Sequence, residues 1–256
     1  SDLPRVRGTA AFCRLHYSVG YAAAALGYRE IMPLIQSALA DAGLLARNPD
    51  GTTPKLRFGP PLPAGCSSMR EYCDAELDST LDDVLSRINS RLADGLQCVQ
   101  CDRIDRKAEP VDRIAFYAEY SFEIPHSLLR ECDVKALREL FDEQGEWLAE
   151  RVSPKGHVRE SDLKKAVTNW RSESSASITT VYLRLAIAHE EGHTASPALV
   201  LQKLFDLNEE QSALVAITRR EMFDRSGAPL RSRPWPRKRN RLLHERCWEH
   251  QRFHHQ

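Results

Sequence analysis

Residues 54–77 read PKLRFGPPLPAGCSSMREYCDAEL, two extended segments separated by a loop rich in proline and glycine. Lys55–Gly59 predicts a short strand, and the alternation from Glu71 to Leu77 predicts a second strand. Proline and glycine fix the backbone between the two segments. This stretch therefore predicts two consecutive strands joined by a rigid connection, and the other elements are assigned outward from it.

The flanking residues add one strand and one helix on each side of this pair. Residues 6–16 are extended and apolar, and residues 29–42 carry apolar side chains at helical spacing before Gly43. Downstream, residues 81–92 have the same helical spacing, and residues 96–104 predict a further strand. The order β-α-β-β-α-β is that of a ferredoxin-like module.

The second half of the chain repeats this order without visible sequence similarity to the first half. Ser196-Pro197 is a typical helix start, and residues 158–167 fit either a strand or a helix. The predicted elements are strands at 114–124, 147–152, 178–188 and 213–222, with helices at 133–144 and 196–207. We therefore expect an α+β fold of two tandem ferredoxin-like modules, residues 1–106 and 111–226, followed by a basic tail, residues 228–256.

The composition is that of an ordinary globular protein. The chain has 256 residues, 36 Lys and Arg, 36 Asp and Glu, and 42% hydrophobic residues. Such a chain buries a sizeable core, which excludes bulk disorder, and no apolar run reaches the roughly 20 residues of a membrane span. We find no secretory signal, and seven cysteines without a small-scaffold pattern fit a reducing compartment. We expect a cytoplasmic protein with no membrane partner.

The balanced net charge hides a basic tail. Residues 228–256 contain eight Lys and Arg against Glu245 and Glu249, a net charge of +6, so residues 1–227 carry −6. Trp235, Trp248 and Phe253 alternate with arginine in the tail, a mixture that suits RNA phosphates and bases. An acidic protein surface, or the acidic body of this chain, is an equally coherent target. The tail residues that we expect to contact RNA are Arg237, Lys238, Arg239 and Arg241.

Residues 54–74 resemble the central signature of the radical-SAM-linked uncharacterised domain family. That signature has a Pro-Lys-hydrophobic-x-Phe-Gly strand, a Leu-Pro-x-Gly turn, a serine and a Glu-Tyr pair. Further matches lie at 162–167, 194–197, 201–207 and 217–223, so the resemblance covers about residues 5–226. The family's Ser-His-Leu-Asp motif is absent from residues 25–31, and its Gly-Phe-Asn-Pro-x-Pro loop is reduced to residues 50–54. The resemblance implies an accessory role around RNA or radical-SAM chemistry, and it supplies no reaction.

The turn from Gly65 to Arg70 is the first candidate site. Backbone N–H groups after Gly65, with the hydroxyls of Ser67 and Ser68, suit a phosphate or carboxylate. Lys55, Arg57 and Arg70 add positive charge nearby. The alternative is a rigid connection between strands in which the serines cap the turn.

Three groups of cysteine and histidine residues could bind a metal, but each also has an explanation that involves no metal. If residues 96–104 are a strand, Cys98 and Cys101 point to opposite faces and are two ordinary thiols. His189 and His193 have zinc-like spacing, but they lie in a loop that contains a glycine. In the tail, His244, Cys247 and His250 lie at helical spacing and form a weak zinc candidate; the alternative is a basic, His-rich tail. We expect no cofactor.

These observations lead to three functional hypotheses. The first is a non-catalytic accessory protein that binds RNA or a ribonucleoprotein and cooperates with a radical-SAM partner. The second is an RNA-modifying enzyme with its site at the Gly65–Arg70 turn. The third is a pure protein adaptor that docks a radical-SAM enzyme.

Overall fold

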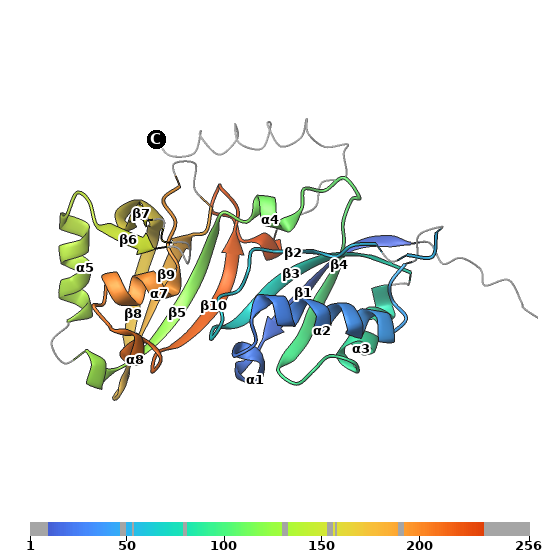
Figure 1. Ribbon diagram of the computed structural model, residues 1–256, viewed down its shortest axis with the longest axis horizontal. Helices are drawn as coiled ribbons and strands as arrows, with labels where there is room; N and C mark the ends of the chain where they lie inside the picture. Colours follow the sequence, from blue (N-terminus) through green and yellow to red (C-terminus); the bar gives the residue numbers. More distant parts are fainter. Residues whose placement is uncertain are drawn as a thin grey trace, which may run out of the picture.

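Both halves of the chain contribute to one mixed sheet of eight strands (Figure 1). The computed structural model describes residues 10–46, 50–52, 54–78, 81–129, 133–152, 156, 158–188 and 192–232. The strands of the sheet are β1 (Ala11–Val19), β2 (Arg57–Phe58), β3 (Ser67–Leu77), β4 (Leu96–Arg103), β5 (Tyr117–Pro125), β8 (Val167–Ser174), β9 (Ile178–Ala186) and β10 (Ala216–Phe223). Their order is β4-β1-β3-β10-β5-β9-β8, and β2 pairs with β3.

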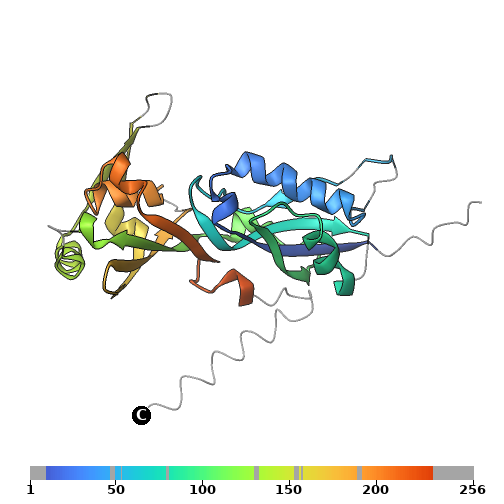
Figure 2. The ribbon, with the colours of Figure 1, turned by 90° about the horizontal axis from the view of Figure 1, so that it is seen from below.

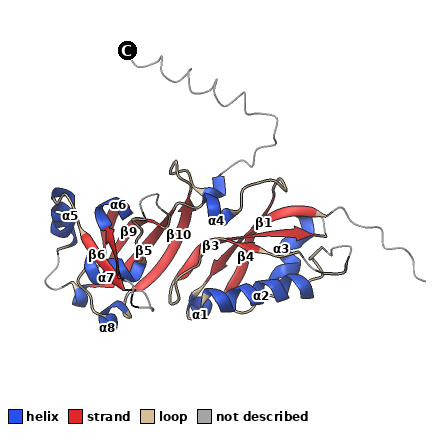
Figure 3. Ribbon diagram, turned by 45° about the horizontal axis from the view of Figure 1, so that its top comes forward, coloured by secondary structure: helices blue, strands red, loops and turns tan. Residues whose placement is uncertain are grey.

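The first half places two helices against β1, β3 and β4 (Figure 3). Helices α2 (Tyr28–Asp41) and α3 (Leu81–Asn89) supply apolar side chains at helical spacing, among them Ile31, Ile35 and Ile88. The N–H group of Gly27 donates to the Glu30 carboxylate at 2.7 Å, which satisfies one free donor at the start of α2. The short helix α1 (Tyr21–Ala24) precedes it. In β1, Cys13, Leu15 and Tyr17 face this layer. Arg14 and His16 point to the opposite face and are buried as well.

The second half covers the same side of its strands with α5 (Val134–Glu143) and α7 (Pro197–Lys203). Trp170 of β8 contacts the rings of Phe141 in α5 and of Phe205, which follows α7, with centroids 5.5 and 6.0 Å apart. Strands β6 (Leu148–Val152) and β7 (Val158–Asp162) form a separate two-stranded hairpin. Three further helices are short: α4 (Val111–Ile114), α6 (Leu163–Ala166) and α8 (Glu209–Ser212). There are also two 3-10 turns in the described residues, η1 (His126–Leu128) and η2 (Leu230–Ser232).

The two halves meet where β3 and β10 run parallel. Ser67 lies opposite Thr218, and Ser68 lies opposite Arg219. The other ladders of the sheet are antiparallel. Helices α2 and α7 lie on one side of the sheet, whereas η2 lies on the opposite side (Figure 2).

The sequence pattern predicts the mixed α/β class and most element positions, and the structure differs from it in several element bounds. The first strand is described as Ala11–Val19, and residues 1–9 lie outside the described residues. Residues 158–174 form β7, the short helix α6 and the sheet strand β8, so the second half has six strands where four were predicted. The N-cap of the short helix α8, Asn208, accepts a hydrogen bond from Gln211, and β10 therefore begins at Ala216 rather than at residue 213.

A β-bulge corrects the expectation for the two cysteines of β4. The register between β1 and β4 shifts between His16 and Tyr17. The bulge adds one residue to β4, so the side chains after it change face. Cys98 and Cys101 therefore both pack against the apolar core beneath α2 and α3, instead of lying on opposite faces. No helix in the described residues is long and apolar enough to cross a membrane.

Candidate functional site

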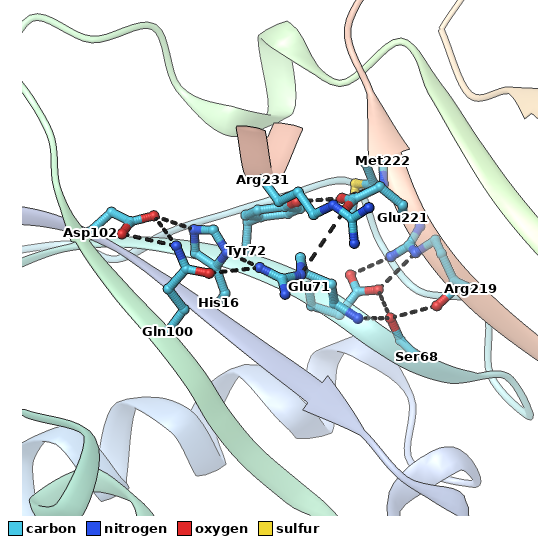
Figure 4. A network of polar contacts seen from close by, with 11 residues as sticks. His16, Ser68, Glu71, Tyr72, Gln100, Asp102, Arg219, Glu221, Met222 and Arg231 are labelled. Atoms are coloured by element: carbon cyan, nitrogen blue, oxygen red, sulfur yellow. Dashed lines mark hydrogen bonds and ion pairs between the residues drawn. The ribbon is translucent and has the colours of Figure 1, made fainter. Parts of the chain in front are cut away.

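A buried ion pair joins the two halves of the chain at the centre of the sheet (Figure 4). Arg219 of β10 donates from Nε to Oε1 of Glu71 at 2.8 Å and from Nη2 to Oε2 at 2.5 Å. Ser68 donates to the same carboxylate at 2.5 Å. Burial alone would lower the pKa of Arg219, but the Glu71 carboxylate raises this pKa, so the guanidinium is charged.

The same arginine fixes the proline-rich loop. Its Nη2 donates to the carbonyl of Pro60 at 3.0 Å, and its Nη1 donates to the carbonyl of Pro61 at 3.3 Å. A proline carbonyl accepts hydrogen bonds although proline has no N–H to donate. The segment 54–74 and the segment 217–223, which carry much of the family resemblance, therefore meet in one buried cluster.

A second group of polar side chains lies on the sheet face that α2 and α3 do not cover. Tyr72 donates to Oε1 of Glu221 at 2.5 Å. Oε2 of Glu221 lies 4.0 Å from Arg70 Nε and 3.5 Å from Arg231 Nε, so two guanidinium groups face it. Burial raises the pKa of Glu221. Arg231 belongs to η2, so this contact brings the C-terminal described residues onto β10.

His16 has a defined tautomer at the edge of this group. Arg70 Nη1 lies 2.8 Å from Nδ1 of His16, and a guanidinium only donates, so Nδ1 accepts. The ring proton is therefore on Nε2, which lies 3.0 Å from Oδ2 of Asp102. Gln100 links both neighbours, because it accepts from Arg70 at 2.9 Å and donates to Asp102 at 2.8 Å. Burial lowers the pKa of His16 to about 4, so the ring is neutral at physiological pH.

The polar side chains at this junction bind one another across the strands of the sheet. The lone pair of His16 is engaged by Arg70, which removes the usual general base. Ser67 and Ser68 are 5% and 3% exposed, and their hydroxyls contact Thr218 and Glu71. Arg14 and Asp74, opposite each other on β1 and β3, form a two-point ion pair at 2.5 and 2.7 Å. Within the described ranges, no group of three or more His, Cys, Asp or Glu side chains has the arrangement of a metal site.

A basic pocket of about 580 Å³ lies between β2 and the segment that joins the two halves. Four of its side chains are cationic, one is acidic and one is aromatic. They are Arg57, Arg106, Lys107, Arg113, Asp112 and Phe58. Arg106 pairs with Glu76. Arg57, Lys107 and Arg113 are exposed and form no ion pair with the residues that the structure describes. The pocket therefore offers positive charge beside the edge-to-face pair of Phe58 and Tyr28, whose ring centroids are 6.2 Å apart.

The structure separates the residues that the sequence brought together. Arg57 lines the pocket, whereas Lys55 is exposed and is not part of its lining. The predicted turn ends earlier than expected, because Ser67, Ser68 and Arg70 begin strand β3. The two serines are buried there, and Arg70 contacts His16. Among the other candidates, Arg237, Lys238, Arg239, Arg241, His244, Cys247 and His250 lie outside the described residues.

Sequence reasoning missed Arg106, Lys107 and Arg113. The available signal is the high charge of residues 105–112, a segment that the sequence pattern identifies only as the connection between the two modules. This segment turns back over the sheet because Val111 and Ile114 are buried in the second core, which leaves the charged side chains between them exposed. His193 also has a structural role, because its Nδ1 accepts from the backbone N–H of Asp162 at 3.1 Å.

The fold and the site define a mixed α/β protein with a buried polar junction and a basic pocket. The chain belongs to the family described as uncharacterized protein conserved in bacteria (DUF2344), whose model matches residues 13–197. No curated protein matches. A solved structure titled "Crystal Structure of an Unknown Protein from Galdieria sulphuraria" is similar at 12% identity and a TM-score of 0.24, covering 82% of this chain and 97% of that one.

Proposed function

We propose that this protein is a non-catalytic accessory protein that binds RNA or a ribonucleoprotein. The observation that carries the proposal is the basic pocket, which Arg57, Lys107 and Arg113 line together with Phe58. Phosphate groups are bound by arginine and lysine, and unpaired bases stack on aromatic rings or guanidinium planes. A volume of about 580 Å³ is large enough for a nucleotide-sized group.

Charge placement supports binding at this pocket rather than at the Gly65 turn. The hydroxyls of Ser67 and Ser68, which follow this turn at the start of β3, are buried and hydrogen-bonded, so they are unsuited to hold a phosphate. The same placement argues against an RNA-modifying enzyme built on Ser67 and Ser68. The pocket instead adds cations in a body whose residues 1–227 carry −6 overall, so its positive charge is local.

We further propose that the two halves are ferredoxin-like units, that the protein has a radical-SAM partner, and that it is cytoplasmic. Strand orders β4-β1-β3-β2 and β10-β5-β9-β8 support two ferredoxin-like units joined through β3 and β10. A radical-SAM partner and a cytoplasmic location rest on the family resemblance. A protein adaptor that docks a radical-SAM enzyme is the competing function, and the experiment below distinguishes the two.

The test is RNA affinity measured across a range of salt concentrations. Log affinity falls with log salt in proportion to the number of phosphates contacted. We expect Lys107→Gln with Arg113→Gln to weaken RNA binding about tenfold and to lower the salt slope by about two. The matched control is Lys135→Gln with Arg138→Gln, which removes two exposed cations from helix α5.

Equal affinities for the two double variants would remove the pocket from the proposal. If the wild-type protein binds no RNA and instead retains a radical-SAM enzyme during purification, the adaptor function replaces RNA binding. A deletion of residues 233–256 tests the tail in the same assay, and an unchanged affinity there would exclude the tail from the RNA contact.

A further inference from the structure

One face of the second-half sheet carries arginine side chains stacked on aromatic rings. In β9, Val181, Leu183 and Leu185 are buried in the core beneath α5 and α7. Tyr182 and Arg184 alternate with them and therefore lie on the opposite face, where they are half-buried. This sheet face is distinct from the basic pocket.

Neighbouring strands extend this face with residues of the same two kinds. Arg171 of β8 lies opposite Tyr182, and its guanidinium carbon is 3.4 Å from the centre of the Tyr182 ring. Arg184 stacks on Phe223 of β10 at 3.6 Å. Arg225 lies over Phe116 at 4.8 Å. Three guanidinium groups are thus each held against a ring, and Arg171 is 48% exposed.

A guanidinium that stacks on a ring with one face still offers its other face and several N–H groups to a ligand. It is weakly hydrated and flat, so bases stack on it while its edge donates to phosphate or base oxygens. Nε of Arg184 is buried and has no hydrogen-bond acceptor among the residues that the structure describes. Because an unpaired buried donor is costly, this atom points to an acceptor that a ligand would supply.

The charge of the face is close to balanced, which makes stacking more important than net charge. The cations Arg171, Arg184, Arg220 and Arg225 lie near the anions Glu119, Glu123, Glu173 and Glu221, four of each sign. Glu173 accepts from Arg171 at 3.2 Å at the exposed end of β8. A duplex presents mainly phosphates, whereas a single strand also offers unstacked bases.

We propose that this stacked-arginine face binds the unpaired bases of single-stranded RNA, as a second contact surface in addition to the basic pocket. The proposal rests on the proposed function in taking RNA as the ligand. Bases stack on the outer face of the Arg171 guanidinium and beside Tyr182, and Arg184 donates to base or phosphate oxygens. The pocket supplies the affinity that depends on phosphate, and the stacked-arginine face supplies the preference for single strands.

The experiment compares an unstructured RNA of about 12 nucleotides with an RNA duplex of the same length, a size within known single-strand sites. We expect Arg171→Gln and Tyr182→Leu each to weaken single-strand binding about tenfold and duplex binding less than about twofold. Arg159→Gln, which removes an exposed arginine from β7, is the matched control. Thermal unfolding of every variant establishes that it is folded.

The outcomes separate this inference from the proposed function. Wild-type binding to RNA with Arg171→Gln and Tyr182→Leu unchanged overturns the stacked-arginine face alone. Equal losses on single-stranded and duplex RNA overturn base stacking as its mode of binding. If the wild-type protein binds neither RNA, the proposed function fails, and this inference fails with it.

Discussion

Arg219 and Glu71 are 148 residues apart in the sequence, and their side chains form a buried two-point ion pair between β10 and β3. Both side chains are at most 3% exposed. Glu71 also accepts from Ser68, while Arg219 holds the carbonyls of Pro60 and Pro61. The pair therefore fixes the parallel contact between the two halves, and we infer that these halves unfold together.

Removing one partner of this pair should destabilise the protein strongly. Arg219→Met leaves the Glu71 carboxylate buried without its cation, which typically costs about 3–5 kcal/mol. We expect a decrease of that size in the free energy of unfolding, measured by urea denaturation.

The double variant Arg219→Met with Glu71→Leu is the control for this prediction. It replaces both charges by apolar groups and should recover much of the loss, because no buried charge is left unpaired. A double variant as unstable as the sum of the two single variants would contradict this account.

The second prediction concerns pH and His16. Its pKa is about 4 in the folded protein, against 6.5 for an unperturbed histidine, because burial disfavours the charged ring. The unfolded chain then binds more protons than the folded chain between these two values. The stability from neutral His16 is fully present above about pH 6.5 and is lost as the pH falls toward 4, on the order of 3 kcal/mol.

His16→Gln isolates this contribution from the carboxylates that titrate in the same range. Asp102, Arg70 and Arg14 all act on His16 and remain in the variant. We expect the difference in unfolding free energy between wild type and variant to shrink from pH 7 to pH 4. Parallel pH profiles for the two proteins would refute the role of His16.

Local patterns predicted the elements of this fold, and long-range contacts determined its junction. The alternation of Glu71–Leu77 predicts a strand, and the spacing of residues 29–42 predicts a helix; each of these signals concerns one element alone. The pairing of Ser67 with Thr218 depends on residues far apart in the chain, and neither segment indicates its partner. The bulge at His16 likewise follows from the match between two strands, so the faces of Cys98 and Cys101 were predicted incorrectly.

The candidate site was predicted in part for a similar reason. Arg57 was found because it lies in the signature segment, and it does line the pocket. Lys107 and Arg113 reach the same pocket only because Val111 and Ile114 are buried and turn the joining segment back over the sheet. From the sequence alone, charged residues in a loop are interpreted as solvent-exposed and without a binding role. Their position in a pocket becomes evident only when the burial of the neighbouring apolar residues is known.

The third prediction compares two glycines with similar backbone angles. Gly95 and Gly65 have φ values of +84° and +82°, so alanine is strained at both. A Cβ atom at Gly95 would lie 2.7 Å from the backbone nitrogen of Ala23, whereas at Gly65 it meets nothing within 4 Å.

Gly65→Ala should therefore cost about 1–2 kcal/mol from backbone strain alone. Gly95→Ala should cost about 1–3 kcal/mol more, because the α1 backbone must move. Chemical denaturation of both variants measures the difference. Equal costs would show that α1 moves away freely.

The last prediction sets where the basic tail can be removed. Leu230 is 1% exposed and packs in the apolar core of the second half. Pro229 forms an isolated β-bridge with Phe223. Arg231 lies 3.5 Å from the Glu221 carboxylate. A chain that ends at Ser232 keeps these contacts, and its melting temperature should match that of the full chain. A chain that ends at Gly227 loses the Leu230 side chain from the core, about 2 kcal/mol. If both truncations melt at the same temperature, residues 228–232 do not support the fold, and the longer deletion can serve in the RNA assay.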